Sequence, residues 1–476
     1  MAIFKIRSPE TTLTGASVEW RKFIGLILST IIRPLFRVLR MRYTLWEGRI
    51  VTACAVDQCF QFGAGGTRRI MHLIRLSVVT LAFLVAIPNM SLSQDGPIVL
   101  AHYMPWFSSK PISGDWGWHW KLKNRNPDNM FDGKREIASH YYPLMGPYDS
   151  ADPDALECHV LLMKMAGIDG VIIDWYGIDD HWDYATNHRN TLAMIKAIKK
   201  AGLKYAICYE DQTVGHLMKA GKIKSDEGIR HGEMVLQYLA ENCFSDSSYV
   251  KINDRPVLLV FGPQFYDDGE MEDICSTVKP TPLLYALPHL VSRANADGAF
   301  GWPPVSGGKE IETEQWTDYL DRLYTPSDKT NRAIATVFPQ FHDYYQEGEG
   351  RESFGSIASG GGETFEETLK RAWNSNSEII QIATWNDFGE GTMIEPTLEF
   401  GYQFLSSIQK QVQLDDAKKT KFEPDSLKLP IRLYRLQKTK TLKQRRDSEL
   451  KEASELLFAG KWREAGKQIR QLETLD

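Results

Sequence analysis

Short apolar segments alternate with longer amphipathic ones along the chain from about residue 96 to residue 412. The short segments are apolar without alternation, which is typical of strands buried on both faces of a sheet. They lie at 98–101, 170–175, 204–209, 256–261, 283–286, 297–300, 333–337 and 378–383, of which 297–300 shows the pattern least clearly. The long segments have apolar residues at helical spacing, and they lie at 155–166, 190–200, 228–241, 314–323, 365–373 and 403–412.

Apolar strands separated by helices predict a parallel sheet that is covered by helices on both faces. Eight strand-helix units over this length favour a closed barrel over an open doubly wound sheet. The first strand is not followed by a glycine-rich phosphate loop, which argues against a nucleotide-binding fold. The predicted fold class is therefore α/β, a single (β/α)8 TIM barrel over residues 95–415.

Both ends of the chain differ in composition from this predicted barrel. Residues 71–94 have the basic start, apolar run and small-residue end of a signal peptide. We expect that translation begins at Met71 and that residues 1–70 are an N-terminal extension; the alternative is a membrane anchor through the apolar run 23–32. An exported protein, periplasmic or extracellular, is expected, and membrane contact only if the N-terminal apolar segment is retained.

The C-terminal extension, residues 416–476, begins with a basic stretch. Residues 448–458 and 461–472 then have apolar positions at helical spacing on either side of Gly460, which predicts a helical hairpin. We expect the hairpin to pack against the outside of the barrel, with docking of a partner as the alternative.

Composition excludes several classes of function. The formal net charge of -5 over 476 residues does not indicate nucleic-acid binding. The sequence contains no CxxC pair, no HExxH and no GxSxG, so neither a metal nor any other cofactor is expected, nor a serine nucleophile. The 13 Trp are a source of rings that stack on sugars, although most are expected in the core.

The segment 384–392, Thr-Trp-Asn-Asp-Phe-Gly-Glu-Gly-Thr, carries the candidate chemistry. It directly follows the last predicted strand, and barrel enzymes keep their catalytic groups at such strand ends. Asp387 and Glu390 lie three residues apart beside aromatic side chains, and a pair of carboxylates is what glycoside hydrolysis requires. The candidate catalytic residues are therefore Glu390 and Asp387.

Polar and aromatic residues follow most of the other predicted strands, and these positions converge on one mouth of a barrel. An acidic mouth lined with rings suits a neutral polyhydroxy ligand, so a polysaccharide or oligosaccharide is the expected partner. The candidate substrate-binding residues are Tyr103, Trp106, Trp118, Asp174, Trp175, Tyr176, Glu210, Asp297, Trp385 and Asn386.

The two candidate catalytic carboxyls need opposite protonation states. Glu390 must hold its proton to act as an acid, and burial beside Trp385 and Phe388, together with the charge of Asp387, is expected to raise its pKa. Asp387 is expected to stay ionised through hydrogen bonds from Asn386 or from backbone amides.

Over residues 97–412 the chain resembles glycoside hydrolase family 99, the endo-acting α-mannosidases, and the broader 71/99-like group. The resemblance rests on four segments, 102–107, 141–153, 170–176 and 390–396. It implies a (β/α)8 barrel that hydrolyses an internal α-linkage with retention. In the family the first of two Glu residues takes a proton from the 2-hydroxyl of the sugar, which forms a 1,2-anhydro intermediate, and the second acts as acid and base.

Carried over to this sequence, the resemblance assigns the acid/base role to Glu390 and places Asp387 where the first Glu stands. It assigns substrate binding to Glu210 and the walls near the cleaved sugar to a set of four aromatic residues, Tyr103, Trp106, Trp175 and Tyr176. The chain departs from the family because Asp387 is one methylene shorter, about 1.5 Å. Phe388 and Gly389 also stand in place of the family's Trp-His. The alternative to a hydrolase is accordingly a carbohydrate-binding barrel that has lost catalysis.

Overall fold

The computed structural model describes residues 42–46, 49–53, 96–325, 332–415 and 425–475, in two compact units, residues 1–91 and 92–476. In the first unit, β1 (Arg42–Trp46) pairs antiparallel with β2 (Arg49–Ala53). The predicted signal segment 71–94 and start at Met71 lie outside the described residues. Among the described helices, none has both the length and the apolar character needed to cross a membrane.

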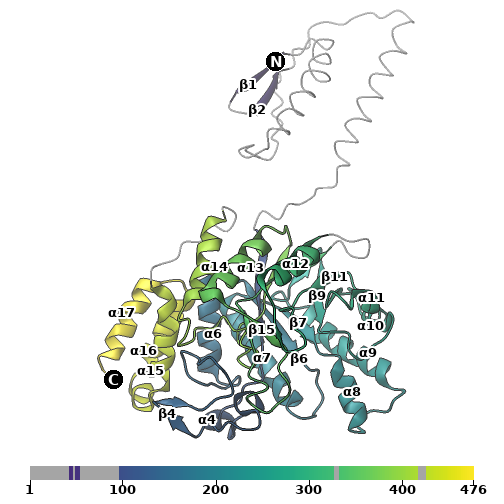
Figure 1. Ribbon diagram of the computed structural model, residues 1–476. Coiled ribbons are helices and arrows are strands. Elements are labelled where there is room, and N and C mark those ends of the chain that lie inside the picture. Colours follow the sequence, from purple (N-terminus) through teal and green to yellow (C-terminus); the bar gives the residue numbers. More distant parts are fainter. Residues whose placement is uncertain (1–41, 47–48, 54–95, 326–331, 416–424, 476) are drawn as a thin grey trace, which may run out of the picture. The chain divides into compact units, whose positions relative to one another are not determined.

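The second unit contains a closed barrel of eight parallel strands (Figure 1). Each strand pairs in parallel with the next, and β16 pairs with β3 to close the ring. The barrel strands are β3 (Ile98–Tyr103), β6 (Gly170–Trp175), β7 (Lys204–Tyr209), β9 (Arg255–Val260), β10 (Leu283–Ala286), β11 (Gly298–Phe300), β13 (Ala333–Val337) and β16 (Ile379–Ile382). The predicted (β/α)8 barrel is confirmed.

A helix follows every barrel strand. In chain order the eight are α6 (Pro153–Ala166), α7 (Tyr184–Ala201), α9 (Gly228–Leu239), α10 (Glu270–Ser276), α11 (Val291–Ala294), α12 (Thr313–Tyr324), α13 (Glu363–Trp373) and α14 (Gln403–Leu414). Local signals set their ends: α6 begins where the Asp152 carboxylate accepts from the Asp154 amide, at 3.1 Å, and ends at Gly167 in the left-handed conformation.

Additional short helices, helical turns and strands lie in the loops between these elements. They are α4 (Lys110–Ser113), α5 (Trp118–Lys121), α8 (Gln212–Lys219), the π-helical turn η2 (Ala240–Phe244), the 3₁₀ turn η3 (Gly360–Gly362), β4 (Met130–Phe131), β5 (Lys134–Arg135), β8 (Lys251–Ile252), β12 (Lys309–Glu310), β14 (Phe341–His342) and β15 (Gly355–Ile357).

Alternate residues of the barrel strands belong to two different layers. Leu100, Ile172 and Ala206 pack together inside the barrel, whereas their neighbours Ala101 and Ile173 pack in the larger layer between strands and helices. Because side chains of a strand alternate between faces, residues two positions further along keep the same direction. This alternation decides which residues at the carboxyl ends of the strands can reach a ligand.

The C-terminal extension forms more helices than predicted. A 3₁₀ turn η4 (Ser426–Lys428) leads into α15 (Leu429–Lys438), α16 (Lys440–Phe458) and α17 (Trp462–Glu473). The predicted hairpin corresponds to α16 and α17, and α15 is the helix that packs against α6 (Figure 1). The sequence did not predict α15, because this segment is rich in basic residues. Its apolar residues Leu433 and Leu436 pack with Leu161 of α6 in a separate hydrophobic cluster.

Candidate active site

The predicted catalytic segment folds into a tight loop after β16. The Thr384 hydroxyl accepts from the Asp387 amide at 2.8 Å and lies 3.0 Å from the Thr392 hydroxyl, which joins the two ends of the loop. Gly391 has a φ of +68°, and a Cβ there would lie 2.5 Å from the carbonyl oxygen of His342. The loop conformation therefore requires glycine at this position.

Different groups hold the two candidate catalytic carboxyls. Asp387, which is 3% exposed, accepts at Oδ1 from the backbone amide of Glu390 at 2.9 Å. Glu390 is partly exposed, and its Oε2 accepts from the indole Nε1 of Trp302, 3.1 Å away. Trp302 follows β11, so a residue from another part of the barrel orients the carboxyl that is the candidate acid.

The surroundings separate the pKa values of these carboxyls. Burial raises the pKa of Asp387 to about 6, although hydrogen bonds from the amides of Glu390 and Gly389 lower it. Burial raises the pKa of Glu390 well above its ordinary value, the charge of Asp387 raises it further, and the bond from Trp302 acts in the opposite direction. Asp387 thus ionises while Glu390 keeps its proton, which is the division of roles that glycoside hydrolysis needs. Backbone amides, rather than Asn386, hydrogen-bond Asp387.

Two further buried carboxyls interact electrostatically with this pair. Burial, followed by the charge of Asp387, raises the pKa of Asp174 to about 8, although a hydrogen bond from Tyr176 lowers it. The pKa of Glu210 is raised by burial and then by the charge of Asp174, with a contribution from Glu390. These electrostatic interactions join the four carboxyls from β6, β7 and β16 into one acidic site.

Aromatic side chains form part of the wall. Trp106 stacks on His119 with ring centroids 4.1 Å apart and an angle of 10° between the planes. Tyr176 lies next to Trp106 at 6.5 Å. Trp118, beside His119 in the chain, is 47% exposed, so its predicted contact with substrate stays a prediction.

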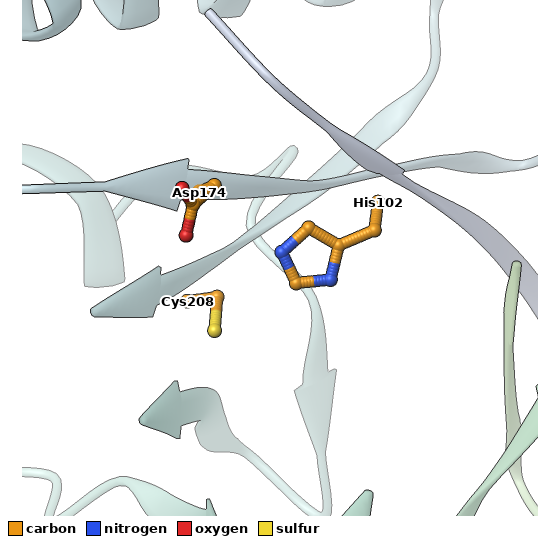
Figure 2. A group of neighbouring side chains, drawn as sticks. All are labelled: His102, Asp174 and Cys208. Carbon is orange, nitrogen blue, oxygen red and sulfur yellow. The ribbon is translucent and has the colours of Figure 1, made fainter. Parts of the chain in front are cut away.

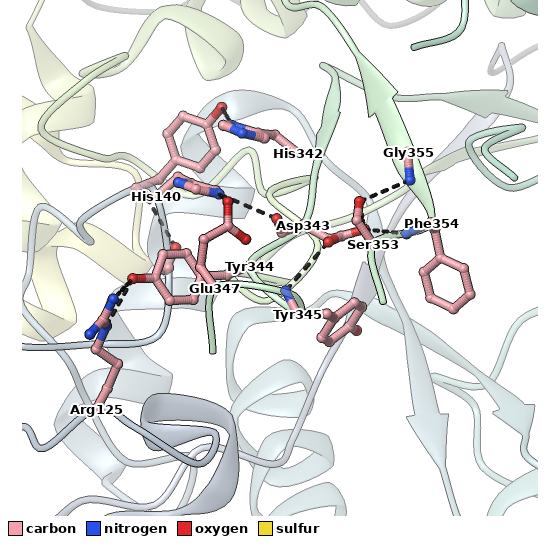
Figure 3. Close-up of polar contacts among 12 residues, drawn as sticks. Arg125, His140, His342, Asp343, Tyr344, Tyr345, Glu347, Ser353, Phe354 and Gly355 are labelled. Atoms are coloured by element: carbon pink, nitrogen blue, oxygen red, sulfur yellow. Dashed lines mark hydrogen bonds and ion pairs between the residues drawn. The ribbon is translucent and has the colours of Figure 1, made fainter. Parts of the chain in front are cut away.

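The loop between β14 and β15, whose polar contacts are drawn in Figure 3, is hydrogen-bonded to the catalytic segment. Backbone amides of His342 and Tyr344 donate to the carbonyl oxygens of Glu390 and Gly389, at 2.9 and 2.8 Å. The Asp343 carboxylate closes this loop by accepting from the Phe354 amide at 2.8 Å, from the Ser353 hydroxyl at 3.0 Å and from the Tyr345 amide at 3.3 Å. Burial, followed by the charges of Glu390 and Asp387, raises the pKa of Tyr345, whose hydroxyl oxygen would lie 3.9 Å from a Cβ built at Gly389.

The structure corrects the placement of three predicted aromatic residues, because their side chains point from the barrel toward the helices. The Tyr103 hydroxyl lies 3.1 Å from Nδ1 of His159 on α6, and the Trp175 indole donates to Nδ1 of His188 on α7 at 3.2 Å. Trp385 is fully buried, 5.7 Å from the His159 ring. Strand alternation is the physical reason for the first two.

Two predicted polar residues also lie outside the mouth. The Asn386 side chain is fully buried and bonds the backbone of Met104 through both of its ends, at 2.8 and 3.0 Å. Asp297 precedes β11 instead of following it, and its carboxylate pairs with Arg255 at 3.0 and 3.1 Å and accepts from the Leu284 amide. It lies at the amino ends of the strands, opposite the site, where it joins β9, β10 and β11.

Three residues of the site were missed. Trp302 lies two residues beyond β11, so assigning that strand correctly would have found it. His102 and Gln381 face the barrel interior, where His102 Nδ1 lies 3.5 Å from the Gln381 side-chain oxygen. Strand alternation could have found both residues. His102 lies two positions after Leu100 and Gln381 two positions after Ile379, and both Leu100 and Ile379 face the barrel interior.

A closed parallel barrel whose mouth holds two carboxyls of unequal pKa defines the class of a glycoside hydrolase. A family model described as Glycosyl hydrolase family 99 matches residues 96–216. A glycoprotein endo-alpha-1,2-mannosidase-like protein of Mus musculus is 32% identical over 332 residues, which cover 62% of this chain and 68% of that protein. The chain belongs to glycoside hydrolase family 99.

Other similarities differ in extent. A glycoprotein endo-alpha-1,2-mannosidase of Xenopus laevis is 20% identical over 62% of this chain and 69% of its own, whereas a mannosidase-like protein of Danio rerio is matched over only 20% of its length, at 30% identity. The solved GH99 endo-alpha-mannosidase of Bacteroides thetaiotaomicron has a TM-score of 0.50 and 17% identity, covering 68% of this chain and 99% of that one, which shows the fold. A second family model, described as Glycosyltransferase WbsX, matches residues 295–408.

Proposed function

We propose that this chain is an endo-acting hydrolase of α-linked mannosyl glycans that works with retention of configuration. The endo action and the mannosyl substrate are taken from the names of its relatives. The observation that carries the chemical proposal is the difference in pKa between the two carboxyls of the catalytic loop. Asp387 has a pKa of about 6, and the pKa of Glu390 is raised so far that it keeps its proton.

The residues divide the reaction in a specific way. Glu390 donates its proton to the departing glycosidic oxygen while its other oxygen accepts from Trp302. Asp387 takes the proton of the 2-hydroxyl, so that this oxygen attacks the anomeric carbon and closes a 1,2-anhydro ring. The ionised Glu390 then removes a proton from water, whose oxygen attacks the anomeric carbon. Asp387 returns its proton to the 2-oxygen as the ring opens, which restores the original configuration. Trp106 and Tyr176 supply rings for the C–H faces of the sugar.

The test is a matched pair of Glu to Gln substitutions, one in the loop that follows β16 and one directly before that strand. Glu390→Gln removes the acid and is expected to abolish the release of new reducing ends from α-mannan oligosaccharides, with unchanged circular dichroism. Glu378→Gln, at the opposite end, is expected to leave turnover unchanged. Proton NMR of the first product distinguishes retention from inversion. Full turnover in Glu390→Gln would remove this residue from the mechanism.

Two other functions for the same pocket have a specific observation behind them. The match to a model named for a glycosyltransferase includes both Asp387 and Glu390, so an acceptor hydroxyl could replace water in the second step. The second alternative is a barrel that binds glycans without cleaving them, because Asp387 is one methylene shorter than the Glu of the family. Products longer than the substrate would support transfer, and binding of mannan oligosaccharides without any product would support the inactive barrel.

We also propose that the protein is exported. The basis is the signal-like composition of residues 71–94, with a start at Met71. Sequencing the amino terminus of the protein from its native cells tests this proposal. A mature chain that retains residues before Met71 would contradict it.

A further inference from the structure

Three side chains with metal-binding atoms meet inside the barrel (Figure 2). His102 comes from β3, Asp174 from β6 and Cys208 from β7, which are neighbouring strands, and Asp174 is paired directly with Cys208. One ligand atom from each of the three lies within 4.8 Å of the other two. The three residues are 0%, 3% and 0% exposed, so the cluster is enclosed by protein, and Asp174 is also one of the four carboxyls of the acidic site.

The His102 ring presents a bare nitrogen to this cluster. The side-chain amide of Gln381 donates through Nε2 to the Gly301 carbonyl at 2.9 Å, which leaves its oxygen, an acceptor only, 3.5 Å from His102 Nδ1. Nδ1 therefore carries the proton and Nε2 keeps its lone pair. Nε2 is buried and has no hydrogen-bond partner among the described residues. Fixing one ring nitrogen through a hydrogen bond is how proteins prepare the other for a metal.

The donor set identifies the class of ion. Imidazole nitrogen, thiolate sulfur and carboxylate oxygen are the ligands of zinc, whereas calcium and magnesium prefer oxygen alone. Donors around a tetrahedral zinc ion lie roughly 3.3–3.8 Å apart, so a spacing of up to 4.8 Å closes with a movement of about 1 Å. We propose that His102, Asp174 and Cys208 form a binding site for a zinc-like divalent ion.

The charges of the donor set suit a divalent ion, because the thiolate and the carboxylate together balance its two positive charges. Three protein donors leave a tetrahedral ion one position for water or a saccharide hydroxyl, as in catalytic rather than structural zinc sites. A search for local motifs such as HExxH does not reveal these donors, because they lie on three separate strands. The proposed metal site does not rest on the proposed hydrolase activity. Its test measures metal content in the absence of substrate, so the two proposals can fail separately.

The test measures metal bound to the full chain, purified without a histidine tag or chelator. Elemental analysis after dialysis against zinc is expected to give about one equivalent. Cobalt loading is expected to produce a thiolate-to-metal band in the near ultraviolet. Cys208→Ala is expected to lose that band and to bind zinc at least 100-fold more weakly, whereas Cys275→Ala, which alters another buried free cysteine, is expected to keep both.

His102→Gln provides a second variant in case Cys208→Ala does not fold, as judged by circular dichroism, and it is expected to weaken zinc binding by a similar factor. Substoichiometric zinc with no cobalt band in the folded wild-type chain would overturn the proposal. A cobalt band and zinc affinity that survive both substitutions would also overturn it, because they would show an adventitious ion only.

Discussion

Replacing Trp302 by Phe tests whether the indole N–H controls the candidate acid. Trp302 donates to Glu390 at 3.1 Å, and its ring packs edge-on against His102 and Phe261, with centroids 5.0 Å away in both cases. Phe keeps most of this packing and removes only the donor. The variant therefore isolates one hydrogen bond between β11 and the catalytic loop.

The size of the effect follows from the difference between two hydrogen bonds. A bond to an ionised carboxylate contributes about 2 kcal/mol and one to a neutral carboxyl about 1 kcal/mol. The N–H thus favours the ionised form of Glu390 by about 1 kcal/mol, or roughly 0.7 pKa unit. Its removal is expected to raise the pKa of Glu390 and move the basic limb of the kcat/KM profile upward by that amount. A carboxyl displaced by about 1 Å would also lower kcat by up to about 100-fold.

The assay is the release of reducing ends from α-mannan oligosaccharides as a function of pH. Trp316→Phe is the matched control, because Trp316 on α12 is 3% exposed and packs against Phe338 in a cluster outside the barrel. It is expected to lower the free energy of unfolding without moving the basic limb. If Trp302→Phe leaves both the basic limb and kcat unchanged, the indole does not position Glu390.

Three further predictions concern the same two loops and the opposite end of the barrel. The wild-type kcat/KM is expected to fall as pH drops through about 6, because Asp387 must be ionised. It is expected to fall again as pH rises through the raised pKa of Glu390, because Glu390 must hold its proton. An acid limb at about pH 4 would exclude Asp387 as the base. Asp387→Glu is expected to lower kcat about tenfold or more, because the longer side chain gives up the 2.9 Å bond from the Glu390 amide, and a gain in kcat would show that reach is what limits the enzyme. Asp297→Asn is expected to lower the free energy of unfolding by about 1 kcal/mol, since its pair with Arg255 is partly exposed, and a changed KM would return Asp297 to the substrate site.

The barrel was predictable because its signal is local. Each strand is a short apolar run between turn residues, and every predicted strand overlaps an observed one. The segment 384–392 was predictable for the same reason, since the hydrogen bond that sets Asp387 beside Glu390 and the Thr384–Thr392 contact form within it. The α15 helix was missed because its buried leucines lie among basic residues that read as solvated.

The errors at Tyr103 and Trp175 come from strand parity, that is, from which face of the strand each side chain points to, and an apolar run without alternation does not show this parity. When a strand is buried on both faces, its sequence does not distinguish the side chains that face the barrel interior from those that face the helices. Tyr103 and Trp175 were chosen for their chemistry, yet their neighbours His102 and Asp174 face inward with Leu100 and Ile172.

Within one strand, a single reference residue is enough to show which side chains share a face. Gly170 of β6 approaches β7 so closely that a Cβ would lie 2.0 Å from the Lys204 carbonyl oxygen. With parity counted from that glycine, residues 172 and 174 fall on one face of the strand and 173 and 175 on the other. The direct pairing of Asp174 with Cys208 then carries the assignment to β7. The acidic floor of the site is therefore a consequence of register, and a shift of one residue in β6 would replace Asp174 by Trp175 and remove a carboxyl from the pocket.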